Sequence, residues 1–300
     1  MNIVARIGIT AITICLGLMP AAAYSAPLAF TADGSNLVSL DIATGNTTII
    51  GALGFTGDTE ALAVDPTSGV LYLATDADKL YTVDKDTGAG TEVGNLGVIY
   101  TNGGMAIDGS GNIFLVTDRG FFSVNKTTGA AVQIGSPNDE TALNNTSYNN
   151  TAVTRGLSSG AFVGNTLYAG PDNDTESNLY TVDTTTGHAT TIGSLGVDST
   201  SQTGLTYDAN TDTLYMLVET TKKIYSVDYA TGQLTEISSF TGNFEGITLA
   251  DPGDPMKAPV PVRPAIPTPT LSSLMLFLLV MAVAVVAFLT SFRPQKETIG

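Results

Sequence analysis

Carboxylates are the side chains with which this chain could do most chemistry. Its 300 residues include 28 Asp and Glu but only 12 Lys and Arg, one His and one Cys, and the formal net charge is −16. A Ser-His-Asp triad needs a buried, oriented histidine, and a zinc site needs several His or Cys ligands. His188 follows the Gly of a predicted turn and is expected at the surface, so neither mechanism is available. The acidic surface also disfavours nucleic acid as a partner.

Two glutamates occupy equivalent positions in two copies of a short apolar segment. Glu60 comes immediately before residues 61–64, and Glu245 immediately before residues 246–249. If these segments are neighbouring strands that converge on an axis, the two carboxylates approach each other. Further carboxylates are expected nearby, those of Asp58 and Asp198. Three interpretations stay open: an ordinary solvated rim, a binding site for sugar hydroxyls or a weak divalent cation such as calcium, and an acid/base pair for glycoside cleavage, which needs carboxyls about 5–10 Å apart.

Both segments belong to a repeat that organises most of the chain. Nineteen-residue copies begin at residues 36, 79, 120, 178 and 223 and align without a gap, as in NLYTVDTTTGHATTIGSLG. Each copy alternates apolar and polar residues, passes through Asp-x-x-Thr-Gly (Asn in the third copy), and alternates again, which predicts a β-hairpin. The aligned Asp side chains can accept N–H bonds within the turn, whereas a calcium loop needs several oxygens at alternating positions. We therefore expect turn residues here and no calcium ligands.

A second predicted hairpin precedes most copies, for example across residues 61–74, and gives four strands per repeat of about 40 residues, the size of a propeller blade. The first copy is preceded only by Leu28–Thr31, and an orphan strand, Phe244–Ala250, follows the fifth. Pairing of this last strand with the first three leaves no edge unpaired. The predicted fold class is therefore all-β: a five-bladed β-propeller over residues 27–251, closed by a C-terminal strand that completes blade one.

The repeats resemble those of secreted bacterial β-propellers with the pattern LYxVDxxTGxxTxIGxLG. The resemblance covers residues 28–250. It implies the fold and leaves the function open, because propellers serve many functions.

The third repeat is lengthened by Ser136–Gly156, a segment rich in Asn and Thr. In a propeller this connection lies on one face beside the channel, so it would overhang the mouth that carries the two glutamates. Long loops are often functional, and Tyr148, Asn149 and Asn150 are candidate ligand-binding residues. A tolerated insertion is the alternative.

The two ends of the chain predict export and attachment. Met1–Ala26 has Arg6, an apolar run and small residues before a cleavage site, as a signal peptide does, and it contains the single Cys. Residues 252–270 are rich in Pro and predict an extended linker. Leu271–Phe292 is long and apolar enough to span a bilayer, and the basic residues in 293–300 place that end in the cytoplasm.

A short signature just before the apolar segment resembles the IPTL-CTERM class of sorting tails. It consists of Ile266, Pro267, Thr268, Pro269, Thr270, Leu271 and Ser272. The resemblance implies processing by an exosortase-like enzyme after the helix has held the chain in the inner membrane. Two features depart from the class pattern: Pro269-Thr270 interrupts Ile-Pro-Thr-Leu-Ser, and the usual Trp-Gly is missing. A plain C-terminal membrane anchor is the alternative.

Together these observations predict an exported or cell-surface protein that acts as a non-enzymatic binding or adhesion module. Its expected partners are an extracellular polysaccharide or protein ligand, and no cofactor is expected beyond a weak divalent cation at Glu60 and Glu245. A carbohydrate-active hydrolase that uses the same two carboxylates is the alternative.

Overall fold

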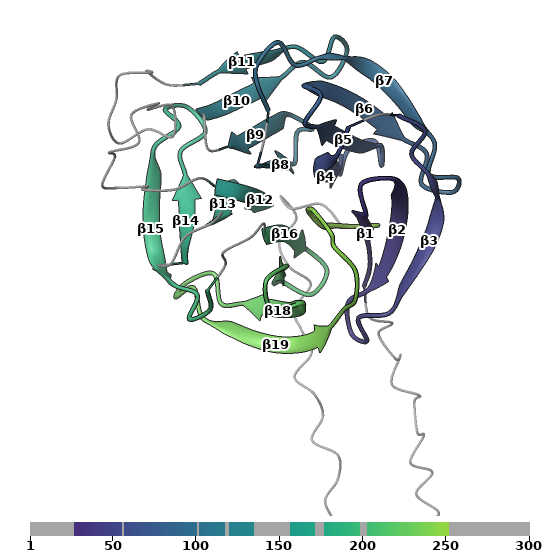
Figure 1. Ribbon diagram of the computed structural model, residues 1–300. Helices are drawn as coiled ribbons and strands as arrows, with labels where there is room; N and C mark the ends of the chain where they lie inside the picture. Colours follow the sequence, from purple (N-terminus) through teal and green to yellow (C-terminus); the bar gives the residue numbers. More distant parts are fainter. Residues whose placement is uncertain are drawn as a thin grey trace, which may run out of the picture.

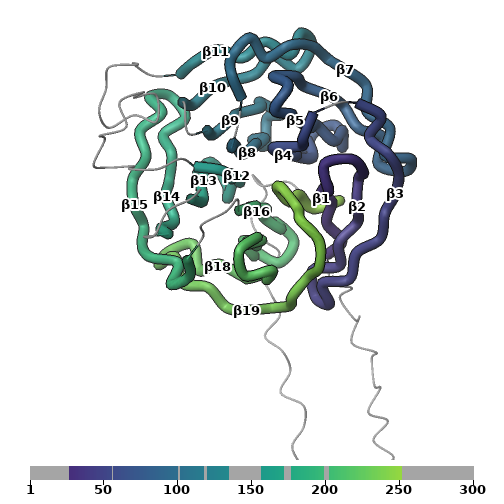
Figure 2. The backbone as a smooth tube through the Cα atoms, viewed as in Figure 1, coloured from purple at the N-terminus to yellow at the C-terminus, as the bar shows by residue number. Residues whose placement is uncertain are grey.

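The described strands form a ring of five four-stranded antiparallel sheets (Figure 1). The computed structural model describes residues 27–55, 57–100, 102–117, 120–134, 157–171, 177–198 and 203–251. The backbone runs once around a central axis, and the last described residues return beside the first (Figure 2). The predicted five-bladed β-propeller is confirmed.

Each blade has an inner strand at the axis and an outermost strand at the rim. Blade one contains β20 (Thr248–Leu249), β1 (Leu28–Ala32), β2 (Asn36–Asp41) and β3 (Thr47–Ala52). Blade two contains β4 (Thr59–Val64), β5 (Leu71–Thr75), β6 (Lys79–Val83) and β7 (Gly90–Asn95). Blade three contains β8 (Gly103–Ile107), β9 (Ile113–Thr117), β10 (Gly120–Val124) and β11 (Ala131–Gln133).

The remaining two blades repeat this order. Blade four contains β12 (Leu157–Val163), β13 (Thr166–Pro171), β14 (Asn178–Val182) and β15 (Ala189–Ser194). Blade five contains β16 (Thr203–Asp208), β17 (Thr213–Val218), β18 (Lys223–Val227) and β19 (Leu234–Ser239). Inner strands such as β4 and β16 are buried along their whole length, whereas the rim strands β3, β7 and β15 are largely polar and half exposed.

The hydrophobic core is divided among the interfaces between neighbouring blades. One cluster, for instance, packs Leu80 and Leu96 of blade two against Met105 and Leu115 of blade three. Equivalent clusters join the other neighbouring pairs, including blade five to blade one. Each blade therefore buries its apolar faces only against its neighbours, and the ring is stable as a closed set of interfaces.

The Asp-x-x-Thr-Gly turns have the predicted structural role. The Asp84 carboxylate accepts the N–H groups of Asp86 and Thr87, both at 2.9 Å, which lowers its pKa. Gly88 has a left-handed backbone (φ 79°). A Cβ on it would lie 2.5 Å from the carbonyl oxygen of Gly51 in the preceding blade, so only Gly fits. The repeated glycines thus permit close contact between blades.

The ring closes through β20, as predicted, although this strand is shorter than the predicted Phe244–Ala250. Its Cα partners in β1 are Ala29 for Leu249 and Phe30 for Thr248. Gly246 has a left-handed backbone (φ 77°), which prevents the extended strand from starting earlier. Threonine hydroxyls also fix β20 to both neighbours: Val64 N–H donates to Thr248 Oγ1, and Leu249 N–H donates to Thr206 Oγ1, each at 3.0 Å.

All five inner strands run in the same direction along the axis, which defines two faces. We call the face on which they begin the mouth face, and the face on which they end the turn face, because the Asp-x-x-Thr-Gly turns lie there. Both described chain ends lie on the turn face. Leu28 accepts a bond from Ala250 N–H at 2.9 Å, and Pro27 accepts one from Ile42 at 3.4 Å.

Candidate functional site

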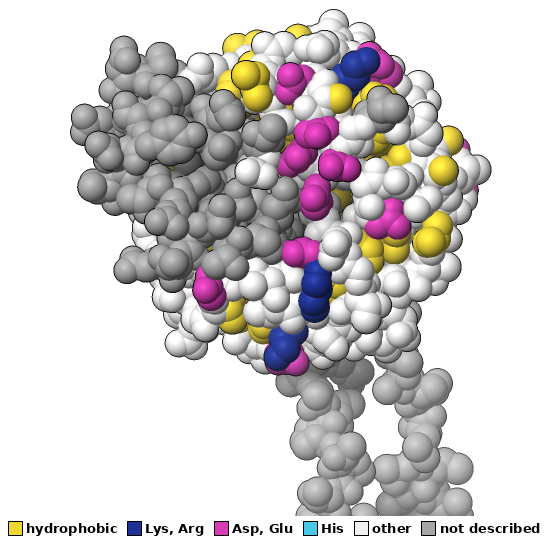
Figure 3. Space-filling view, viewed as in Figure 1, with side chains coloured by type: hydrophobic (Ala, Val, Ile, Leu, Met, Phe, Trp, Pro, Cys, Tyr) yellow, Lys and Arg dark blue, Asp and Glu magenta, His cyan; other side chains and the backbone are white. Residues whose placement is uncertain are grey.

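Glu60 and Glu245 lie at the mouth face, in neighbouring blades. Glu60 is the second residue of β4, at a bulge between Thr59 and Ala61, and Glu245 is three residues before β20. Figure 3 shows Asp and Glu side chains gathered near the centre of this face, with a basic side chain beside them. The equivalent inner-strand positions in the other blades carry uncharged residues, namely Gly103, Ser158 and Thr203. The fold therefore does not require an acid at this position.

Glu60 is buried and has a structural role. It is 7% exposed, and its Oε2 accepts the backbone N–H of Asn102 at 2.7 Å. Asn102 has a left-handed backbone (φ 48°) and belongs to the connection between β7 and β8. The Glu60 carboxylate thus holds a strained turn of the next blade. The interpretation of the two glutamates as an ordinary solvated rim is wrong for Glu60, because a neighbouring main chain covers it.

Tyr100, in the same connection, is enclosed next to Glu60. Its side chain is 0% exposed, and its hydroxyl has no hydrogen-bond partner. Burial, and then the negative charge of Glu60, raise the pKa of the Tyr100 hydroxyl well above its usual range. A Cβ on Gly103 would lie 2.6 Å from the ring, so only Gly fits at the start of β8.

Glu245 is the more unusual of the two acids. It is partly buried, and its Oε2 is enclosed without any hydrogen-bond partner. Burial raises the pKa of this carboxyl to about 7, and the charges of Glu60, Asp58, Glu219 and Asp76 contribute in that order. Glu245 is therefore about half protonated near neutral pH. A carboxyl in this state can accept or release a proton under physiological conditions.

Three more carboxylates surround Glu245 on the mouth face. Asp58 and Asp76 form a clip in which Asp58 N–H donates to Asp76 Oδ1 at 2.8 Å and Asp76 N–H donates to the Asp58 carbonyl at 3.1 Å. Glu219 forms an ion pair with Lys222. The Lys222 ammonium also donates to the Gly242 carbonyl at 2.9 Å and so supports the segment that leads to Glu245. We call Asp58, Glu60, Asp76, Glu219 and Glu245 the axial acidic cluster.

Asp76 and Glu219 were not predicted, although a repeated sequence signal marks both. The residue directly after the second strand of every blade is acidic: Asp33, Asp76, Asp118, Asp172 and Glu219. Asp198, which was expected near the glutamates, is exposed in the connection after β15 and is not one of the charges that raise the pKa of Glu245. His188 is partly exposed beside its turn.

The opposite mouth also contains a buried carboxylate, but that one is paired. Asp65 follows β4 on the turn face and is 0% exposed. Its carboxylate accepts Lys126 Nζ of blade three at 2.9 Å, and the N–H and hydroxyl of Thr67 at 2.8 and 2.7 Å. Burial alone would raise the pKa, but bonds from Thr67, Lys126 and Ser68 outweigh it and lower the pKa to about 2.

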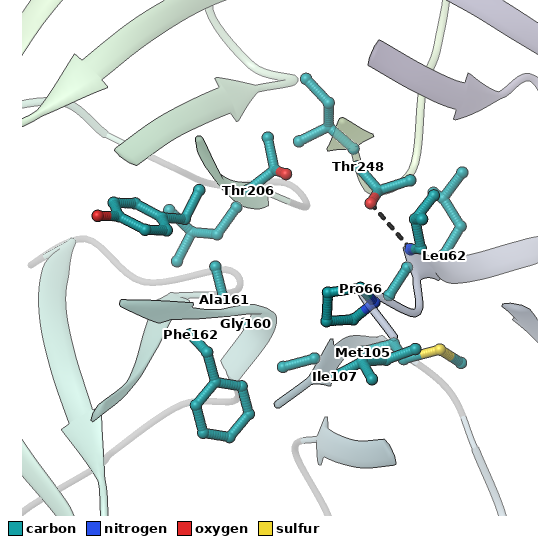
Figure 4. Close-up of a pocket in the computed structure, with 15 residues that line it drawn as sticks. Leu62, Pro66, Met105, Ile107, Gly160, Ala161, Phe162, Thr206 and Thr248 are labelled. Carbon is teal, nitrogen blue, oxygen red and sulfur yellow. Dashed lines mark hydrogen bonds between the residues drawn. The ribbon is translucent and has the colours of Figure 1, made fainter. Parts of the chain in front are cut away.

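The channel between the two mouths is narrow and mostly apolar. The inner strands enclose a cavity of about 50 Å³, lined by residues such as Leu62, Met105, Phe162 and Ile247. In Figure 4 the hydroxyls of Thr206 and Thr248 lie near its wall, and Thr248 bonds to the main chain of β4. This volume holds a few water molecules at most. This part of the channel is therefore too small for a larger ligand.

Several predictions concern residues outside the described ranges. These are the loop with Tyr148, Asn149 and Asn150, the signal peptide, the sorting signature 266–272 and the apolar segment 271–292. No helix in the described part of the chain is both long enough and apolar enough to cross a bilayer. Within the same part, no three His, Cys, Asp or Glu side chains converge as a metal site requires. The calcium site at Glu60 and Glu245 stays a prediction that would need ligands of other kinds.

Fold and site define a class: a closed five-bladed β-propeller with an acidic axial mouth. The chain belongs to the family described as "Domain of unknown function (DUF4394)", whose sequence profile matches residues 56–250. No curated protein matches the sequence. Among solved structures, 1019 chains are similar. One, from "Crystal structure of Nidogen/Laminin Complex", has a TM-score of 0.51 at 13% identity and covers 75% of this chain and 99% of its own, which supports the fold alone.

Proposed function

We propose that this protein is an exported binding or adhesion module without enzymatic activity, and that its ligand binds at the mouth face around Glu245. The observation that carries the proposal is the enclosed Oε2 of Glu245, which has no hydrogen-bond partner. A buried carboxylate without partners costs folding stability. Since the equivalent positions of blades three, four and five carry Gly, Ser and Thr, the fold does not require an acid there. A ligand that pairs with the carboxylate gives it a role.

The direct test screens the purified protein against extracellular polysaccharides and proteins, with parallel measurements of binding and of newly released reducing ends. Binding without release, weakened by Glu245→Gln but unchanged by Glu236→Gln, supports the proposal. Glu236 is a suitable control because it lies on the rim strand β19, exposed and paired with Lys223, far along the blade from the axis. Equal binding by all three proteins would place the ligand elsewhere.

A carbohydrate-active hydrolase is the second candidate. It is favoured by the raised pKa of Glu245, about 7, which is in the range of a general acid, together with a second carboxylate close by. The narrow channel argues against a deep substrate cleft along the axis. Release of reducing ends by the wild type, lost in Glu245→Gln, would establish this activity in place of simple binding.

The proposal includes export to the cell surface through the predicted tail. Both described ends lie on the turn face, so an attachment that follows Asp251 leaves the mouth face accessible. We expect the mature protein to lack Leu271–Gly300, with processing at or near Thr270-Leu271. Mass spectrometry of the C-terminal peptide tests this expectation, and an intact apolar segment in the mature protein would leave membrane anchoring instead.

A further inference from the structure

Hydrogen bonds among the described residues already engage donors beside the axial acidic cluster. Asn102 N–H is used by Glu60, Asp58 N–H is used by Asp76, and Lys222 is paired with Glu219. Glu245 lies among four like charges that raise its pKa. A ligand that suits this arrangement must therefore bring donors and positive charge.

A second observation, independent of the charges, also points to a ligand at this mouth. In the described part of the chain, four buried side-chain atoms have no hydrogen-bond partner: Thr59 Oγ1, Thr75 Oγ1, Tyr100 Oη and Glu245 Oε2. Thr59 begins β4, Thr75 ends β5, Tyr100 lies in the connection to β8 and Glu245 precedes β20, so all four lie at the mouth end of their blades. Thr59 and Thr75 face each other across β4 and β5, and both are 0% exposed, as is Tyr100. Buried polar groups are nearly always paired, and of these four residues only Glu245 is partly exposed, so an external polar group would reach the mouth at Glu245.

The geometry favours a polyatomic cation over a metal ion. No three carboxylates among the described residues converge on one point, as they would around calcium. A guanidinium group carries five N–H donors spread over a planar fork and can bond to several separated acceptors at once. The cavity of about 50 Å³ in the channel is lined from Leu62 to Pro66 of blade two, beyond Glu60 towards the turn face, and it has no room for a sugar ring.

We propose that the axial acidic cluster binds the guanidinium group of an arginine side chain presented by a protein partner. Glu245 is the carboxylate that contacts it, and Glu60 is a positioning residue, because its Oε2 already holds Asn102. This inference rests on the proposed binding function and names its ligand chemistry. The inference also predicts a pH dependence, because the guanidinium binds the charged form of Glu245. Any Glu245 that is protonated beforehand must release its proton on binding. The groups that act on Glu245 are Glu60, Asp58, Glu219 and Asp76, with Lys222 paired to Glu219.

The test uses acetyl-arginine amide as the probe and acetyl-citrulline amide as its uncharged isostere, titrated into the purified protein by calorimetry and NMR. We expect the citrulline compound to bind at least about tenfold more weakly, as loss of a charge-assisted bidentate pair predicts. Between pH 8 and pH 6 the wild-type affinity for the arginine compound should fall about tenfold, since the charged fraction of Glu245 falls by that factor around a pKa near 7. Glu245→Gln should bind weakly and show no such pH dependence.

Glu236→Gln is the matched control, because it removes the same charge from an exposed site on the rim. It should keep affinity within about twofold of wild type, as expected for a distant surface charge. Equal binding of the two probes, or of the two Gln variants, would overturn the inference. A melting shift with calcium but not with the arginine probe would overturn it in favour of a metal site. If polysaccharides bind in a Glu245-dependent way while the arginine probe does not, the guanidinium assignment fails and the binding function stands.

Discussion

Two acids at opposite ends of the channel differ in their partners: Asp65 follows inner strand β4 on the turn face, and the partly buried Glu245 precedes inner strand β20 on the mouth face. On the turn face, Asp65 accepts an ammonium, a hydroxyl and a backbone N–H, and its pKa is lowered to about 2. On the mouth face, Glu245 has an enclosed oxygen without a partner, and its pKa is raised to about 7. The first acid stabilises the fold. The second acts against it, and the proposed binding function rests on this difference.

The largest effect is expected from deleting β20, the inner strand of blade one. Deletion of residues 243–250 removes β20 and exposes the edge of β1 together with the channel wall. We expect the sharp unfolding transition to disappear in calorimetry and urea titration. A chain that ends after Asp251 keeps β20 and is the control. A deleted chain that melts as sharply and at the same temperature as that control would contradict closure by β20.

The next largest effect on stability is expected from replacing Asp65, the paired acid. Asp65→Ala leaves Lys126 and Thr67 without their acceptor, and we expect a loss of about 2–4 kcal/mol in the free energy of unfolding at pH 7. Because the folded pKa is lowered, this contribution is present above the unfolded pKa of 3.8 and is lost as pH falls towards 2. Urea titrations at several pH values measure it. A difference from wild type that persists unchanged at pH 2.5 would contradict the assignment.

Replacing Glu245, the unpaired acid, is expected to have a smaller effect of opposite sign, a gain in the free energy of unfolding. The folded pKa of Glu245 is raised from 4.5 to about 7, so the folded state binds its proton more tightly and loses relative stability as pH rises between these values. After discounting for partial exposure, Glu245→Gln should be more stable than wild type by about 1–2 kcal/mol at pH 8 and equal to it below pH 4.5. Glu236→Gln should follow wild type at every pH. A destabilised Glu245→Gln at pH 8 would mean that Glu245 has a structural partner.

The smallest effect concerns calcium. No three described acids converge as a calcium site requires. If calcium does bind at Glu60 and Glu245, then at about tenfold above its dissociation constant it would raise the melting temperature by a few degrees, because a bound ion stabilises the folded state by about 1.4 kcal/mol. The double variant Glu60→Gln and Glu245→Gln should lose this response and still fold, since an amide carbonyl in place of the Glu60 carboxylate can still accept the Asn102 N–H. No response in wild type, or an equal response in the double variant, would remove calcium from consideration.

Much of the fold could be predicted because it repeats. Alternation and the Asp-x-x-Thr-Gly turns predicted the hairpins, and counting the strands before residue 36 and after residue 243 predicted closure. The same alignment predicted Glu60 and Glu245 at one mouth, where the structure has them. It could not predict that Glu60 is buried, because the connection of the next blade covers it and Asn102 takes an unusual backbone conformation there. Nor could it predict that Tyr100 lies beside Glu60, since that contact depends on how two blades meet.

The closing strand has a mechanical consequence. Glu245 lies at one end of the segment that contains β20, and Asp251, where the predicted tether begins, lies at the other, only six residues along the chain. When a ligand is held at the mouth and the tether is fixed, tension passes along this segment, parallel to the axis. This tension acts in shear on the pairing of β20 with β1 and on the hydrogen bonds to the hydroxyls of Thr248 and Thr206. Blades two to four carry little of the force. Mechanical strength of the attachment would then be set by one two-residue strand.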